Sequence, residues 1–136
     1  MFLLINTAEQ EKITAALIIS SGRVFKQKTV QDSKAKSNQL LILIDKLLLA
    51  NKIVAQKIKG IIVVTGPGAF SRLRTGVATA NAMAFALKIP IVGVNLREAD
   101  NLEKIIIAGM KKIAKGGDKI VEPFYGREPN ITKKKA

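Results

Sequence analysis

The first part of the chain carries three short blocks of apolar and β-branched residues, separated by polar turns. Residues 2–5 are wholly apolar, residues 13–20 are rich in β-branched side chains, and residues 23–30 intersperse lysines with apolar residues. Such blocks predict β-strands, and Ser21-Gly22 suits a two-residue hairpin turn. We therefore expect an antiparallel meander whose third, lysine-bearing strand lies at an edge of the sheet.

Longer segments follow. Residues 38–50 are too long and too rich in leucine for a strand and predict a helix that is apolar on nearly all sides. Residues 61–64 are wholly apolar, as in a central parallel strand covered on both faces. A helix, a strand and a last helix are expected over residues 70–88, 91–94 and 98–115.

This order, βββαβαβα, predicts an α/β fold with a mixed five-stranded sheet in the order 3-2-1-4-5. Right-handed crossovers then place the first two helices side by side on one face and the last helix on the other. This arrangement is the core of the ribonuclease-H and actin-like ATPase folds. We expect one domain over residues 1–120, closed by the last helix, and a tail over residues 121–136.

The amino-acid composition excludes several classes of functional site. The 136 residues contain no Cys and no His, which excludes cysteine-based zinc sites, disulfides and imidazole catalysis. The formal net charge of +13 suits an acidic partner, although lysines that merely solvate the surface would give the same value. No leader is visible and no apolar segment is long enough to span a bilayer. We expect a cytoplasmic protein without a membrane partner.

The glycine-rich turn at residues 66–68 joins a predicted strand to a predicted helix. Such a turn can cradle a phosphate, but Ser71 stands where G-x-G-x-x-G needs its third glycine, and no P-loop Gly-Lys follows. The alternative is a tight turn that lets the helix approach the strand closely. Ser71 is then a candidate helix cap.

The helix after this turn carries two rows of small residues at i, i+4 spacing. Gly76, Ala80 and Ala84 form one row, and a second row holds Ala78, Ala82 and Ala86. One row suffices for the chain's own sheet, so a partner helix is favoured for the other. The predicted partner interface comprises Leu40, Leu43, Ile44, Leu47, Gly76, Ala80 and Ala84. We expect Ala80→Arg to leave the chain folded and to abolish partner binding.

Catalytic groups are scarce. Thr7, Ser20, Ser71 and Thr75 lack a suitable base, and the two strands at residues 61–64 and 91–94 contain no acid. The sequence therefore predicts a protein that is not an enzyme, with no catalytic residue, no metal site and no cofactor.

Residues 66–76, GPGAFSRLRTG, resemble the GPGSFTGLRIG signature of the TsaB (YeaZ) family, with Gly66, Pro67, Gly68, Phe70, Arg74 and Gly76 matching. Residues 3–8 resemble the family's I-L-x-I-D-T-S strand, and residues 122–132 its P-x-Y-x-R-x-P ending. Asn6 replaces the acid that related ATPase folds use, and Arg72 replaces a small glycine. Most of a second lobe is expected to be missing near residues 95–102.

The resemblance implies a non-catalytic scaffold in the synthesis of tRNA threonylcarbamoyladenosine. TsaB-like proteins pair with TsaD, the metal-dependent transferase, through the first two helices. A TsaD-like transferase is therefore the expected partner, with a homodimer through the same face when that partner is absent, and with tRNA reached through the complex. The lack of His implies that the chain is not TsaD itself, whose metal site needs His.

Two alternatives stay open. The first is a basic tRNA-binding module that uses Lys57, Lys59, Arg72 and Arg74 with the terminal lysines. The second is a residual ATPase or hydrolase of actin-like fold, against which the missing acid at Asn6 argues.

Overall fold

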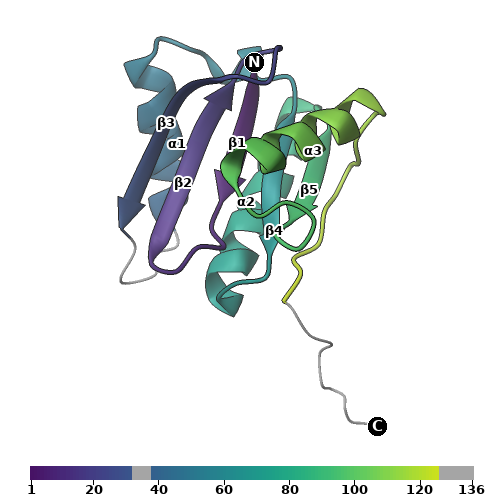
Figure 1. Cartoon of the computed structure of the whole chain (residues 1–136). Helices are drawn as coiled ribbons and strands as arrows, with labels where there is room; N and C mark the ends of the chain where they lie inside the picture. Colours follow the sequence, from purple (N-terminus) through teal and green to yellow (C-terminus); the bar gives the residue numbers. More distant parts are fainter. Residues whose placement is uncertain (32–37, 126–136) are drawn as a thin grey trace, which may run out of the picture.

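A five-stranded sheet in the order β3-β2-β1-β4-β5 forms the centre of the computed structural model (Figure 1). The structure describes residues 1–31 and 38–125. Strand β1 (Phe2–Asn6) pairs antiparallel with β2 (Lys12–Ile18), which pairs antiparallel with β3 (Val24–Gln31). On its other side β1 pairs parallel with β4 (Ile61–Gly66), which pairs parallel with β5 (Ile91–Asn95). The predicted strand order is confirmed.

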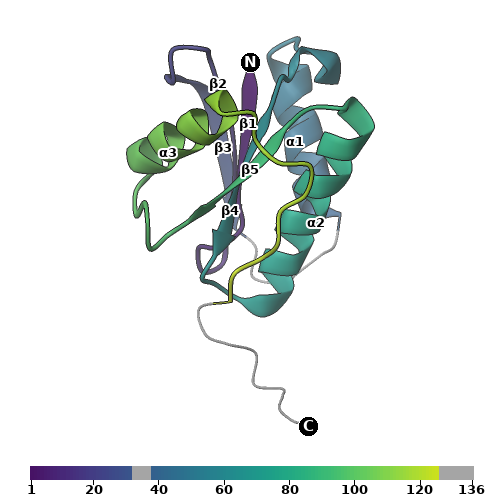
Figure 2. The ribbon, with the colours of Figure 1, turned by 90° about the vertical axis from the view of Figure 1, so that its right-hand side faces the viewer.

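Three helices cover the two faces of this sheet, as expected from right-handed crossovers. Figure 2 shows α1 (Gln39–Ala50) and α2 (Phe70–Leu87) together on one face and α3 (Leu102–Ala114) on the other. A short 3-10 helix, Ala55–Lys57, lies between α1 and β4 and was not predicted. No helix among the described residues is long and apolar enough to cross a membrane.

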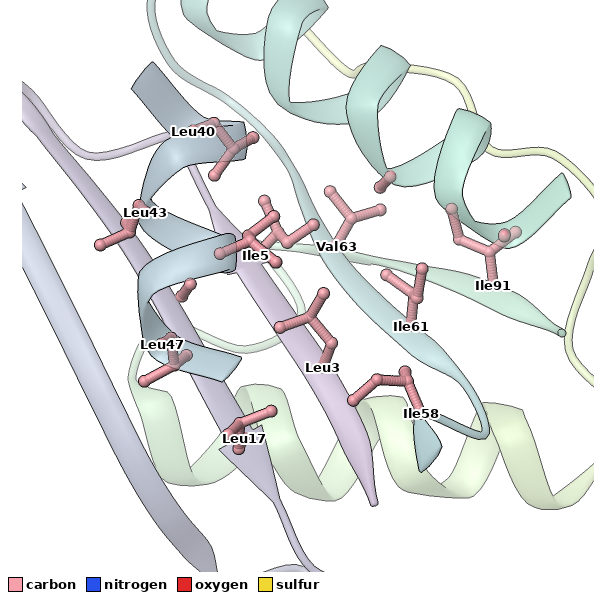
Figure 3. Packing of buried hydrophobic residues seen from close by; sticks show 14 of the residues in the cluster. Leu3, Ile5, Leu17, Leu40, Leu43, Leu47, Ile58, Ile61, Val63 and Ile91 are labelled. Carbon is pink, nitrogen blue, oxygen red and sulfur yellow. The ribbon is translucent and has the colours of Figure 1, made fainter. Parts of the chain in front are cut away.

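The central strands are buried on both faces, which explains their unbroken apolar sequences. On β1, Leu3 and Ile5 face α1 and α2, whereas Leu4 belongs to the core under α3. All three side chains are fully buried. Figure 3 shows the first core, where leucines of α1 meet the side chains of β1 and β4. Burying each such side chain contributes about 1.5–3 kcal/mol, so these two cores dominate the stability of the fold.

Local details differ from the sequence-based expectations at three places. The loop between β2 and β3 contains residues 19–23 and is longer than the expected two-residue turn; the Ile19 amide donates to the Arg23 carbonyl at 3.0 Å, and Gly22 adopts a φ of +90°. Helix α2 begins after Ala69, so Ser71 lies inside the first turn and caps nothing. Helix α3 begins only after Asn101, whose side chain accepts a hydrogen bond from the Lys104 amide at 2.9 Å.

Helix α2 lies close to the end of β1 because Gly76 has no side chain. A Cβ at this position would overlap Thr7 Oγ1 and lie 2.8 Å from Thr7 Cγ2. Thr7 Oγ1 also donates a hydrogen bond to the Arg72 carbonyl at 2.9 Å, which fixes the first turn of α2 against the strand. The glycine thus allows a contact between helix and strand that a larger residue would prevent.

We predict that Gly76→Ala destabilises the protein by about 1–3 kcal/mol through overpacking, although alanine is the better helix former. The midpoint of urea unfolding measures the change. In a Thr7→Ala background the same substitution should cost at least about 1 kcal/mol less, because the contacting atoms are gone. An equal cost in both backgrounds would show that Thr7 is not the constraint.

The structure reverses the expectation for Ala80→Arg. Ala80 is fully buried, so an arginine there forces a charge into the core at a cost of several kcal/mol or unfolds the chain. Far-ultraviolet circular dichroism during thermal unfolding tests this prediction. Ala82→Arg is the matched control, because Ala82 lies two residues further along α2 and is exposed, and its unfolding transition should stay near that of the parent.

Candidate functional site

The glycine turn between β4 and α2 is enclosed by backbone from two other segments. A side chain at Gly66 would overlap the carbonyl oxygen of Phe124, and one at Gly68 would lie 2.6 Å from that of Ala8. Gly66 also has a φ of +132°, which favours glycine. Pro67 is partly buried between them. The chain itself fills the space beside these glycines, which favours the tight turn over the phosphate cradle.

A segment near the end of the described chain is tied to this turn and to α2. The Phe124 amide donates to the Thr65 carbonyl at 2.8 Å. The side-chain amide of Asn81 donates to the Val121 carbonyl at 2.8 Å and accepts from the Val121 amide at 2.9 Å. Asn81 was not singled out from the sequence. The one available signal is an isolated amide, both donor and acceptor, within an alanine-rich helix.

The first turn of α2 presents an aromatic and basic group of side chains. The rings of Phe70 and Tyr125 lie 4.6 Å apart, and the Arg74 guanidinium lies 5.3 Å from the Phe70 ring centre. Arg72 Nη1 is buried without a hydrogen-bond partner among the described residues. Phe70 therefore contacts both Arg74 on its own helix and Tyr125, which lies near the other end of the described chain.

The residues predicted to form the partner interface lie in the chain's own core. They are Leu40, Leu43, Ile44, Leu47, Gly76, Ala80 and Ala84. The three leucines point from α1 toward β1 and its neighbours (Figure 3). This choice of residues needs correction, because side chains packed against the sheet are not available to a partner. Whether the two helices bind a partner through other residues stays a prediction.

The opposite sides of these helices form an exposed surface, which we term the outer face. Its apolar members are Leu41, Ile42 and Leu49 of α1 with Ala78, Ala82, Phe85 and Ala86 of α2. Leu49 is 69% exposed and Phe85 is 85% exposed. Side chains of this kind gain free energy when they are removed from water. The second row of small residues on α2 is thus the exposed row.

The four predicted RNA-binding residues do not form one site. Lys57 and Lys59 precede β4, whereas Arg72 and Arg74 follow it. A strand separates the two pairs, and they lie at opposite ends of the sheet. The structure therefore does not support a single basic patch made of all four residues.

The end of β1 carries polar groups. Asn6 Oδ1 accepts a hydrogen bond from the Ala8 amide at 2.9 Å, so the amide closes a local turn. Asn6, Glu9 and Lys12 line a cavity of about 370 Å³ beside it. No group of three or more His, Cys, Asp or Glu side chains suited to a metal occurs in the described parts of the chain.

One carboxylate near this end of the sheet has a shifted pKa. Partial burial works to raise the pKa of Glu98, but hydrogen bonds from Lys112 and from the Asn95 amide outweigh it and lower this pKa below its usual value. Lys112 Nζ also donates to the Gly93 carbonyl at 2.8 Å. These contacts hold the last turn of α3 against β5 and the segment that follows it, which is a structural role.

Comparisons with known proteins place the chain in a family. The family model described as "TsaD: tRNA N6-adenosine threonylcarbamoyltransferase" matches residues 24–106, more than half of the chain. A tRNA N6-adenosine threonylcarbamoyltransferase from Geotalea daltonii is 34% identical over 79 residues, which cover 58% of this chain and 23% of that protein. One from Geobacter metallireducens is 38% identical over 63 residues, covering 46% and 18%. The chain thus spans about a fifth of these relatives.

A solved structure supports the same relationship. YeaZ from Pseudomonas aeruginosa superimposes with a TM-score of 0.61 and 26% identity, over 70% of this chain and 44% of that protein. The matched parts include the mixed sheet with its helices, so the predicted actin-like fold and the resemblance to TsaB (YeaZ) are confirmed. The chain therefore belongs to the TsaD family of tRNA N6-adenosine threonylcarbamoyltransferases, and shares its fold with YeaZ.

Proposed function

We propose that this protein is a non-catalytic scaffold subunit that pairs with a TsaD-like transferase in the synthesis of tRNA N6-threonylcarbamoyladenosine. The observation that carries the proposal is the outer face of α1 and α2. Among the described residues, four of the nine exposed large hydrophobic side chains lie on this face: Leu41, Ile42, Leu49 and Phe85. A surface of this composition is typical of a contact with another protein.

The shape of the outer face suits a pair of helices from a partner. Ala78, Ala82 and Ala86 form a row of short side chains on α2, so a second helix can approach its backbone closely. Leu41 and Phe85 supply larger side chains on the two helices. Two helices laid across α1 and α2 would complete a four-helix packing, which is the pairing implied by the resemblance to TsaB.

The side-chain chemistry of this chain favours a non-catalytic role beside the transferase. It contains no His, and Asn6 stands at the strand end where an acid would be needed. Glu98, whose pKa is lowered, is paired with Lys112 at 3.0 Å. The transferase reaction is therefore assigned to the partner, and this chain contributes the surface on which that partner is held. Without the partner, the same apolar face is expected to pair two copies of this chain.

We predict that Ala82→Arg abolishes co-purification with the TsaD-like protein encoded in the same organism when the two are co-expressed. A guanidinium buried in a helix interface without a counter-charge costs about 2–5 kcal/mol, enough to weaken binding by well over tenfold. Co-purification through an affinity tag on the partner, followed by size-exclusion chromatography, measures the complex.

Ala114→Arg is the matched control for this experiment. Ala114 is an exposed alanine at the end of α3, on the opposite face of the sheet. The control variant should co-purify as the parent does. The docking assignment fails if Ala82→Arg binds the partner normally, or if both variants lose binding to the same extent.

A further inference from the structure

A second surface lies where the parallel strands begin, and we term it the amino edge. Strand pairing gathers four segments there, because Phe2 pairs with Ile18, Leu3 with Ile61, and Ile61 with Ile91. The Lys59 amide also bonds the Met1 carbonyl at 2.7 Å. Beyond β5, Ile91 forms a bridge with Asp118. Residues far apart in the sequence therefore form one continuous line along this end of the sheet.

The amino edge is strongly basic. Its exposed charged residues, among those the structure describes, are eight cations and two acids: Arg23, Lys52, Lys57, Lys59, Lys88, Lys111, Lys115 and Lys119 with Glu103 and Asp118. The opposite edge is nearly balanced, since five basic residues accompany four acids there: Lys12, Arg72, Arg74, Arg97 and Lys104 with Glu9, Glu11, Glu98 and Asp100. The charge of the described domain is thus concentrated at one end.

Helix stability explains only part of this cluster. Lys52, Lys88 and Lys115 follow the C-terminal ends of α1, α2 and α3, where a positive charge interacts favourably with the helix dipole. Arg23 lies in a hairpin loop and Lys119 follows the Asp118 bridge. Arg23 therefore has no helix end to stabilise, whereas Lys119 lines a cavity with Phe85 and Lys88 at the end of α2.

The cations of the amino edge outnumber its acids. The two ion pairs found among the described residues, Lys104 with Asp100 and Lys112 with Glu98, both lie elsewhere. Burial, and then the ammonium group of Lys59, lower the pKa of the Met1 amino group. Positive charges therefore repel one another at this edge, and a polyanion would relieve that repulsion.

We propose that the amino edge binds the phosphate backbone of a folded RNA. From the β2–β3 loop to Lys119 the line crosses four strand spacings, which amounts to about 19 Å. A row of separated lysines over this distance matches a row of phosphates better than it matches a compact acidic site. The contacts are to phosphates, so the binding is expected to be independent of RNA sequence.

This proposal does not depend on the scaffold function. The amino edge is formed by loops at one end of the sheet, whereas the outer face lies along the sides of α1 and α2. Binding of RNA by the isolated chain and binding of a protein partner can therefore be measured and lost separately.

The test is the salt dependence of binding between the full chain and an unmodified tRNA transcript. We expect binding at low salt, and a variant with Lys57→Gln, Lys59→Gln and Lys119→Gln to bind on the order of 100-fold more weakly near 0.1 M salt. The slope of log affinity against log salt should fall by roughly 2–3. These three lysines are exposed and none lies in an α-helix, so folding should be unaffected.

The matched control removes the same charge elsewhere, with Lys12→Gln, Lys28→Gln and Lys46→Gln, all exposed. The control should keep most of the affinity, and the amino-edge variant should still bind the protein partner. Equal losses in both triple variants, or no tRNA binding by the parent chain at low salt, would overturn the proposal. The proposal would also be overturned if the amino-edge variant lost binding to phosphatidylserine vesicles or to polyglutamate but bound tRNA as the parent chain does.

Discussion

The burial of β1 and β4 on both faces is the constraint on which the rest of the structure depends. Leu3 and Ile5 need cover from one side and Leu4 from the other, so the sheet must lie between two helical layers. Helices α1 and α2 supply one layer and α3 the other. Both faces of the central strands are then used for stability. Surfaces left for binding are the outer sides of the helices and the two ends of the sheet.

The fold was largely predictable because this constraint leaves a clear mark on the sequence. Wholly apolar runs marked the central strands, and connection lengths with right-handed crossovers fixed the strand order. Details set by single side chains were not predictable. The expected helix began at residue 98. The side chains of Asn95 and Asn101 accept hydrogen bonds from nearby backbone amides instead, and α3 begins only at Leu102. Such competition between local hydrogen bonds does not alter the hydrophobic pattern.

The candidate site was predicted less well, for two physical reasons. Both rows on α2 consist of small residues. The contact that decides between them, Gly76 against Thr7, joins distant parts of the chain. Periodicity therefore identified two rows without showing which one faces the sheet. Likewise, Lys59 and Arg72 are close in sequence, but β4 runs between them and separates them by the length of a strand. Their closeness in sequence therefore did not predict that they lie far apart in the fold.

The two proposed surfaces meet where α1 and α2 end. Leu49 and Phe85 belong to the outer face, and Lys52 and Lys88, three residues further along, belong to the amino edge. A protein held on the outer face would therefore extend beside the basic line, and an RNA on that line would lie against both proteins. Two weak contacts joined in this way bind more tightly than either alone, because the second forms at a high effective concentration. If both proposals hold, the chain would bring its protein partner and an RNA together at the ends of α1 and α2.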